Sequence, residues 1–423
     1  MDDTVDSALF KPIELHCGTR LKNRLVKSAM SDSLGDGGGD PSDSQMRLYE
    51  RWAEGGVAVS IVGEVQGDPH FAEKPGNLVL GPASNLERFA ALARRGSVNG
   101  AQLWLQLGHA GAMAHPPISD PRGPSALDLA GLKCSAFTES EVDALPLQFA
   151  QTARLAKELG FGGVEVHAAH GFLLSQFLSP LFNHRADKYG GSIENRMRLL
   201  LAVVEEVRRA VGPHFPVSIK LNATDQLEGG LVEEDALTVI AALDATQVDL
   251  IDISGGTYFP GAKSASDRVG GGPYFVGFAE RARPLTRKPL MVTGGFKTQQ
   301  QATDALARGV DMVGLARALV LDPALPNRWL SGQAADPTFP KFDNPPEGGI
   351  TAWYTMRLTE IGEDREGTEV GDLHEAITAY DTRDDVRVDI WKSRAGWADR
   401  TATSRPTPGP QRSDLSAKAE RGD

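Results

Sequence analysis

The feature that most constrains the fold of this chain is an eightfold alternation of short apolar strands with helical stretches. Three long stretches between the strands, 43–56, 145–162 and 192–212, carry apolar residues at three- and four-residue spacing, which is typical of amphipathic helices. Gly212 follows the last of them as a helix stop. The strand candidates are 24–30, 57–65, 101–108, 163–169, 216–223, 250–256, 289–295 and 312–318.

This alternation predicts right-handed crossovers and a parallel sheet. Eight strand–helix units within about 330 residues predict an α/β fold, a closed (β/α)8 TIM barrel. An open doubly wound sheet is the structural alternative. It is disfavoured because the first strand is followed by the glycine-rich run 30–40, with no helix at the spacing of a dinucleotide fingerprint. We interpret that run as a loop.

Beyond about residue 345 the alternation stops. We therefore expect the barrel to occupy 1–345 and a C-terminal helical extension to occupy 346–396, with one helix at 351–362. The extension is expected either to cap the active site or to form a homo-oligomer contact. We expect 397–423 to be a disordered tail, because it is rich in Pro, Ser, Arg and Asp.

Composition narrows the function. A hydrophobic content of 41% and a charged content of 24% are those of a soluble globular protein, and the net charge of −12 argues against nucleic acid or an anionic membrane as partner. Two cysteines, Cys17 and Cys134, are too few for a disulfide framework or for the thiolates of an iron–sulfur cluster. No signal peptide and no long apolar run are found, so we expect a cytoplasmic protein.

In such a barrel the chemistry lies where strands end. Backbone amides after the seventh and eighth strands bind phosphate in many barrels, and Gly295 and Arg317 stand there. The alternative is a tight turn and an ordinary surface arginine. The polar or small residues at the strand ends are Ser31, Gly63, Glu64, Gln106, His109, His167, His170, Lys220, Asn222, Ser254, Tyr258, Gly294, Gly295, Gly314 and Arg317.

Three of these residues have more than one interpretation. Lys220 points into the barrel mouth, where it could meet a ligand that gathers negative charge or form a structural ion pair with Glu165 or another carboxylate. His167 and His170 lack the HExxH pattern and a third ligand, so we expect no metal. They are either core histidines or donors of N–H bonds to a polar ligand.

The segment 160–212, "GFGGVEVHAAHGFLLSQFLSPLFNHRADKYGGSIENRMRLLLAVVEEVRRAVG", resembles the hallmark region of the Old Yellow Enzyme family. The resemblance extends through 9–30, "QLGHAGA" (106–112), "SIKLNA" (218–223) and "VDMVGLARALVLDP" (310–323), and covers roughly residues 9–330. These enzymes are FMN-bearing barrels, so the resemblance implies FMN as cofactor.

The family's cofactor contacts transfer to matching residues of this chain. By resemblance, Ala29, Met30 and Ser31 lie along the flavin, with Ser31 near its N5/O4 edge, and Gln106 binds the pyrimidine side of the ring. Lys220 stands beside N1 and O2, where a fixed cation favours the anionic reduced flavin. The remaining cofactor positions, most of them on the phosphate-binding segments, are Gly63, Gly294, Gly295, Ala316 and Arg317.

The resemblance also implies a small-molecule substrate and places it. His167 and His170 match the pair that binds a carbonyl or nitro oxygen, which polarises a conjugated C=C bond for hydride from the reduced flavin. His109, Phe172 and Tyr258 are expected to line the substrate pocket. Enoate reductases of the family commonly have a proton-donating tyrosine at the position of Phe172.

Because phenylalanine cannot donate a proton, three interpretations follow. Tyr258 donates instead or is only a pocket wall; a water donates; or the reaction needs no such proton. The first two fit an NAD(P)H-dependent ene-reductase. The third fits an NAD(P)H:quinone or acceptor oxidoreductase, or a flavin-dependent dehydrogenase of a biosynthetic intermediate. The chain shows no second dinucleotide domain, so NADH or NADPH is expected to bind directly over the FMN. A non-catalytic barrel that binds a phosphorylated metabolite is the alternative from another class.

Overall fold

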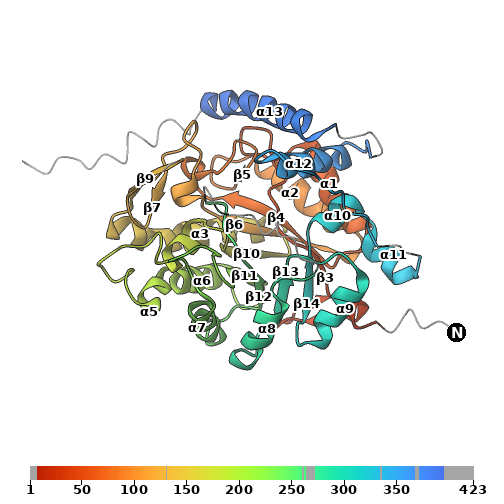
Figure 1. The fold of residues 1–423 in the computed structure, drawn as a ribbon, viewed down its shortest axis with the longest axis horizontal. Coiled ribbons are helices and arrows are strands. Elements are labelled where there is room, and N and C mark those ends of the chain that lie inside the picture. Colours follow the sequence, from red (N-terminus) through yellow and green to blue (C-terminus); the bar gives the residue numbers. More distant parts are fainter. Residues whose placement is uncertain are drawn as a thin grey trace, which may run out of the picture.

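The computed structural model of the protein describes residues 7–129, 131–259, 262, 272–333, 336–366 and 371–394. The tail expected at 397–423 lies outside these residues. Eight parallel strands pair in the order β3–β14–β13–β12–β11–β10–β6–β4, and β3 also pairs with β4, which closes the barrel (Figure 1). The predicted TIM barrel is therefore confirmed. Its strands are β3 (Leu25–Lys27), β4 (Val59–Gln66), β6 (Gln102–Gly108), β10 (Gly163–Ala168), β11 (Val217–Asn222), β12 (Leu250–Ser254), β13 (Leu290–Thr293) and β14 (Met312–Leu315).

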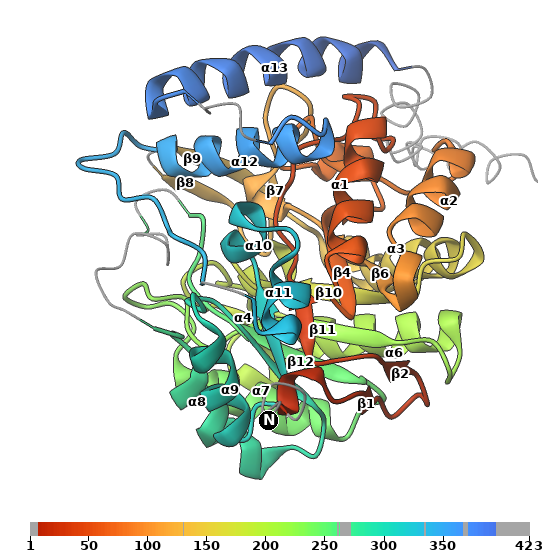
Figure 2. The same ribbon diagram turned by 90° about the vertical axis from the view of Figure 1, so that its right-hand side faces the viewer.

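Helices surround the strands in the described part of the chain, as Figures 1 and 2 show. Two of them begin with a capping box, formed by Thr138 with Glu141 and by Thr298 with Gln301, in which each side chain binds the other residue's backbone N–H. The helices of the barrel are α1 (Asp43–Glu54), α2 (Leu86–Arg95), α3 (Glu139–Glu158), α4 (Leu173–Leu178), α5 (Ile193–Arg196), α6 (Arg198–Val211), α7 (Glu233–Asp244), α8 (Val276–Ala282), α9 (Gln299–Ala307), α10 (Arg317–Leu321) and α11 (Leu325–Ser331).

The stretch 192–212, which the sequence predicts as one helical run, is divided into α5 and α6 at Met197. The buried side chain of Arg196 turns inward there and donates to the Gly191 carbonyl at 3.0 Å and to the Asp235 carboxylate at 2.7 Å. The predicted stop is confirmed, since α6 ends at Gly212 with φ +77°.

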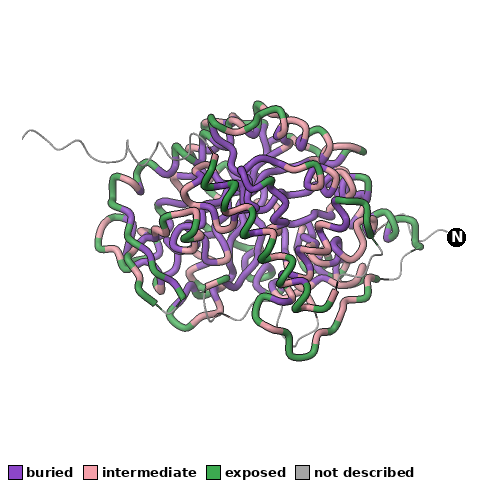
Figure 3. Tube along the Cα trace, turned by 90° about the horizontal axis from the view of Figure 1, so that it is seen from above, coloured by how far each residue is buried: buried purple, intermediate pink, exposed green. Residues whose placement is uncertain are grey.

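The core has two layers. Inside the barrel, apolar side chains from several strands meet in one buried cluster that includes Val26, Ile61, Trp104, Leu250 and Met312. A larger buried cluster lies between the strands and the outer helices. Figure 3 shows the result, with buried backbone at the centre and exposed backbone around the rim. Close packing on both sides of the strands holds their carboxyl ends, and the site formed there, in a fixed position.

In the described part of the chain, six short strands lie outside the barrel ring. A hairpin of β1 (Ile13–Glu14) and β2 (Arg20–Leu21) packs against the inner cluster, and β5 (Leu78–Val79) pairs with β4. Between β6 and α3 stand β7 (Arg122–Gly123), β8 (Leu127–Leu129) and β9 (Leu132–Ala136), which form a three-stranded sheet.

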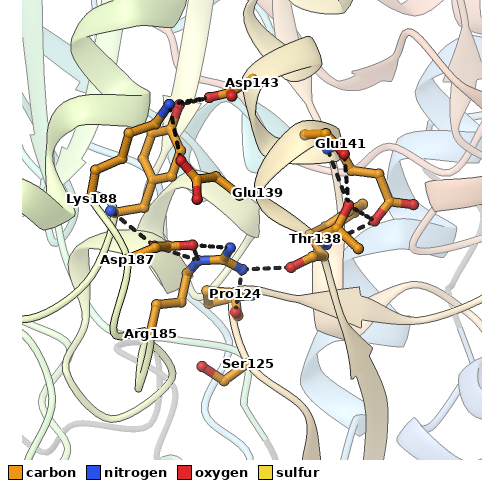
Figure 4. A network of polar contacts seen from close by, with 12 residues as sticks. Pro124, Ser125, Thr138, Glu139, Glu141, Asp143, Arg185, Asp187 and Lys188 are labelled. Carbon is orange, nitrogen blue, oxygen red and sulfur yellow. Dashed lines mark hydrogen bonds and ion pairs between the residues drawn. The ribbon is translucent and has the colours of Figure 1, made fainter.

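A polar network joins this sheet to the segment that follows α4 (Figure 4). The Arg185 guanidinium donates to the carbonyls of Pro124, at 2.9 Å, and Phe137, at 2.6 Å, and it is ion-paired with Asp187. Lys188 pairs with Asp143 of α3 at 2.8 Å. The segment that follows α4 is thus anchored both to the region of the three-stranded sheet and to α3.

Two helices follow the barrel, α12 (Gly349–Gly362) and α13 (Leu373–Ser393), and α12 contains the helix expected at 351–362. In Figure 2, α13 lies above and alongside α12, which packs on α1 and α10. The glycine-rich run 30–40 is a loop that runs beneath α13, where Arg387 donates to the Ser33 carbonyl at 2.6 Å. None of the helices in the described ranges has the combination of length and apolarity needed to cross a bilayer.

Candidate active site

A cavity of about 320 Å³ opens at the carboxyl ends of the barrel strands. Besides strand ends, its wall includes Tyr354 of α12 and Tyr380 of α13, so the C-terminal helices cover it. The expectation that the extension caps the site thus agrees with the geometry. Of the residues predicted for the site, the wall includes Ala29, Met30, Ser31, Gln106, His167, His170, Tyr258, Gly294, Gly295, Ala316 and Arg317.

Four predicted residues, Gly63, His109, Phe172 and Lys220, stand behind the wall of this cavity. A side chain at Gly63 would collide with the Met30 carbonyl, so this glycine lets β4 approach the loop after β3. His109 is buried and stacked on Phe71, with 4.2 Å between ring centroids, and burial lowers its pKa to about 4.

Lys220 has carboxylate partners inside the barrel. It forms an ion pair with Asp252 on the neighbouring strand, and its Nζ lies 3.7 Å from Glu165 Oε1. Burial lowers the pKa of Lys220, but the two carboxylates together raise it by more than burial lowers it. The pKa of Lys220 is therefore above its usual value. The structural ion pair considered from the sequence is therefore present.

Two wall residues connect this buried cluster to the cavity. Gln106 Nε2 donates to Glu165 at 2.8 Å, and Thr293 Oγ1 donates to Asp252 at 2.7 Å. Burial raises the pKa of Glu165 to about 7, so the balance of charge around Lys220 changes when this one carboxyl takes up a proton.

His167 and His170 form one hydrogen-bonded unit, here called the histidine pair. Nε2 of His167 lies 3.2 Å from Nδ1 of His170, whose Nε2 lies 2.9 Å from the Ser254 hydroxyl. His170 has φ +62°, and its backbone N–H donates to Asn222 Oδ1 at 3.0 Å. Nδ1 of His167 is buried without a hydrogen-bond partner among the described residues.

Both imidazoles are neutral. Burial, with the charge of Lys220 in support, lowers the pKa of His170 to about 3, and burial together with His170 lowers the pKa of His167 well below its usual value. A neutral imidazole has one donor and one acceptor, so the pair can bind a ligand oxygen without becoming charged.

Tyr258 and Phe172 flank the histidine pair. The ring of Phe172 is buried and lies 4.8 Å from the ring of His167, while the ring of Tyr258 lies 5.7 Å from that of His170. Tyr258 lines the cavity, and 57% of its surface is accessible. Loss of water around its hydroxyl, followed by the charges of Glu64 and Glu73, raises the pKa of that hydroxyl to about 12.

The cavity wall also contains residues for which the sequence predicts no role. The sequence marks Glu64 only as a polar residue at a strand end, and Glu73 and Lys74 lie in a connection without periodicity. Tyr354 and Tyr380 come from the C-terminal helices, and the Arg317 guanidinium lies over the Tyr354 ring at 5.6 Å. A tyrosine in the helical pattern of 351–362 was the one available signal for Tyr354.

The donors present fit FMN. Gly294 and Gly295 have φ +121° and +84°, so their backbone can approach an anion closely, and Arg317 on the same wall supplies a guanidinium fork. Ser31 and Gln106 offer polar groups to a heterocycle elsewhere on the wall. Within the described ranges, no three His, Cys, Asp or Glu side chains are grouped so that they could hold a metal ion.

Comparison with known proteins agrees with this site. Residues 8–336 match the NADH:flavin oxidoreductase / NADH oxidase family. The chain is 36% identical over 354 residues to the NADH-dependent flavin oxidoreductase iliE of Neonectria sp. (strain DH2), covering 75% of this chain but only 46% of that protein. It is 32% identical to the protein of the same name from Hypocrea jecorina (strain QM6a), covering 81% of this chain and 95% of that protein.

Among solved structures, morphinone reductase superposes with a TM-score of 0.68 at 25% identity, covering 80% of this chain and 93% of that one. The resemblance to Old Yellow Enzyme is thus confirmed. The chain belongs to the NADH:flavin oxidoreductase / NADH oxidase family and is an FMN-dependent oxidoreductase that takes its reducing equivalents from a nicotinamide nucleotide.

Proposed function

We propose that this enzyme reduces an activated C=C bond, conjugated to a carbonyl or nitro group, with NADH or NADPH as the source of hydride. The observation that carries the proposal is the neutral histidine pair in the cavity wall, with Nδ1 of His167 free of partners among the described residues. Such a pair can bind the acceptor's oxygen and stabilise the negative charge that grows there when hydride adds to the β-carbon.

The surrounding residues keep the pair in position. Ser254 and Asn222 hold His170, and the buried ring of Phe172 supports His167 from behind. Bound FMN would supply the hydride chemistry, and the wall residues Ala29, Met30, Ser31, Gln106, Gly294, Gly295, Ala316 and Arg317 would hold it. Tyr258, a neutral phenol beside His170, would donate a hydrogen bond to the acceptor.

One observation favours a second candidate, an NAD(P)H:quinone or acceptor oxidoreductase. Phe172 occupies the position beside His167 where an ene-reductase of this family commonly has its proton donor, and a phenyl ring cannot donate. Quinones take up their protons on oxygen, which exchanges protons readily with water. Such acceptors need no carbon-directed acid in the protein.

Anaerobic stopped flow separates the two. The holoenzyme is reduced with NADH or with NADPH and then mixed with 2-cyclohexenone, an enal or a quinone, while flavin absorbance is followed. Alkene reduction predicts rapid reoxidation by the enone or the enal, and a loss of at least about tenfold in His167→Ala, since charge-stabilising donors are worth more than this. If only the quinone reoxidises the enzyme, the proposed alkene reduction is wrong.

A further inference from the structure

Two glutamates share one wall of the cavity, Glu64 at the end of β4 and Glu73 in the connection that follows. The side chain of Glu64 is 6% exposed. Its Oε2 and the Oε2 of Glu73 are both buried, and neither has a hydrogen-bond donor among the described residues. A buried anionic oxygen without a donor is costly, so two of them side by side require an explanation.

One proton shared between the two carboxyls accounts for both unpaired oxygens. A protonated carboxyl donates where an ionised one can only accept, so a single shared proton satisfies both orphan oxygens. Burial, followed by the facing carboxyl of Glu73, raises the pKa of Glu64 well above its usual value and so favours the protonated carboxyl.

The neighbouring charges do not remove the proton. Asp32 lies close enough to raise the pKa of Glu64 further, while the amide of Asn77 lowers it. The pair in turn acts on nearby phenols, since its carboxyls raise the pKa of Tyr258. The ionisable groups around the two carboxyls are Asp32, Lys74, His115, Tyr258 and Tyr380.

We infer that Glu64 and Glu73 form an acid pair that holds one shared proton and donates it to the acceptor in the cavity. This inference rests on the proposed alkene reduction. The C=C π bond breaks as hydride, which the nicotinamide nucleotide would supply by way of bound FMN, forms a C–H bond at the β-carbon. The proton of the acid pair forms the second C–H bond at the α-carbon. The two carboxylates that remain then regain one proton from water.

The acid pair also explains how a chain with Phe172 could retain alkene reduction. A general acid works best when its pKa lies near the working pH. The pKa of the Tyr258 hydroxyl, raised to about 12, lies far above neutral pH, which makes this hydroxyl a weak general acid there. Tyr258 then orients the acceptor, and the acid pair supplies the proton.

Infrared difference spectroscopy tests the shared proton without turnover. The holoenzyme, labelled with ¹³C-glutamate, is compared at about pH 7 with Glu64→Gln, Glu73→Gln and the control Glu87→Gln, whose side chain is exposed on α2. We expect the spectrum of the wild type minus that of each pair variant to contain a protonated-glutamate carbonyl band, and the spectrum of the wild type minus that of Glu87→Gln to contain none. Glu165, whose pKa is raised to about 7, is present in all four proteins, so its own band cancels in these differences. No such band in either pair-variant difference overturns the acid pair.

Stopped flow then tests donation. Glu64→Gln and Glu73→Gln should each slow reoxidation of the reduced holoenzyme by 2-cyclohexenone by about 100-fold, the range of a general acid, and remove its pH dependence, while Glu87→Gln behaves as wild type. If the wild type turns over the enone and both pair variants keep its rate, the acid pair alone is wrong. If the enone does not reoxidise the wild type, donation fails together with the proposed alkene reduction.

Discussion

The phenyl ring of Phe172 lies 4.8 Å from the imidazole ring of His167, centroid to centroid, with the two planes tilted by 45°. The ring of Phe172 is also 6.2 Å from that of Tyr258, so an apolar ring adjoins both polar rings at the position where ene-reductases of this family commonly have a proton donor. The chemistry of the site therefore depends on where its protons come from.

Introducing a tyrosine hydroxyl at position 172 tests where the proton comes from. Phe172→Tyr should raise the rate of reoxidation by 2-cyclohexenone at least about tenfold in the Glu64→Gln background, because it provides a second general acid. Stopped flow on the single and double variants measures the effect. Phe177→Tyr, at another buried phenylalanine that does not line the cavity, is the matched control for burying a hydroxyl. Equal rates in Glu64→Gln with and without the new tyrosine would contradict the prediction.

Arg317 should control retention of the flavin phosphate. Arg317→Ala removes a charged donor from the cavity wall, and we expect FMN binding to weaken by about 10- to 100-fold, as the loss of one charge-assisted hydrogen bond implies. Titration of the apoprotein with FMN, followed by quenching of flavin fluorescence, gives the Kd. Arg308→Ala, which breaks an exposed ion pair with Glu280, should leave the Kd unchanged. An unchanged Kd in Arg317→Ala would place the phosphate elsewhere.

Lys27 should make stability fall as the pH is lowered. It is fully buried, donates to the Ser28 carbonyl at 2.7 Å and lies 4.2 Å above the Trp52 ring. Burial, opposed in part by Asp32, lowers its pKa from 10.5 to about 7. Because the folded state binds this proton less well than the unfolded state, the free energy of unfolding decreases as pH falls from about 10 to about 7 and levels off below.

Lys27→Met should therefore gain stability relative to wild type as pH falls over that range. Urea unfolding at about pH 9.5, 8 and 7 measures the difference. The matched control is Lys133→Met, since Lys133 is exposed and Asp128 raises its pKa. A difference between Lys27→Met and wild type that is constant with pH would show that Lys27 does not titrate as a buried amine.

Arg185 should be a structural anchor for the segment shown in Figure 4. Arg185→Ala leaves the carbonyls of Pro124 and Phe137 without this donor and Asp187 without its partner, so we expect a loss of about 3 kcal/mol in the free energy of unfolding. Chemical denaturation gives the value. Arg154→Ala, which breaks an exposed i,i+4 pair with Glu158, should cost well under about 1 kcal/mol. Similar losses in the two variants would refute the anchor.

The sequence predicted the barrel well because each strand carries its own signal. Apolar runs bounded by helical stretches mark the eight barrel strands without knowledge of their neighbours, and the strand ends then placed Gln106, His167 and Arg317 in one cavity. The break between α5 and α6 was not predictable, because it depends on the long-range bonds of Arg196.

Other parts of the site depend on pairing and packing between segments that are distant in the sequence. Asp252 as the partner of Lys220 follows from the β11–β12 register, which puts the two residues directly opposite each other. Glu73 reaches the cavity from an irregular connection. Tyr380 reaches it from α13, which follows the barrel in the chain and packs on α12. No local pattern in the sequence encodes these approaches.

The position of α12 and α13 in the chain has a consequence for assembly. The ribosome completes β14, the last barrel strand, before either of these helices has been synthesised. Since domains generally fold from the N-terminus during synthesis, Tyr354 and Tyr380 are the last of the described wall residues to be added to the cavity. A chain that stopped after β14 would leave the cavity open on the side where these two tyrosines stand.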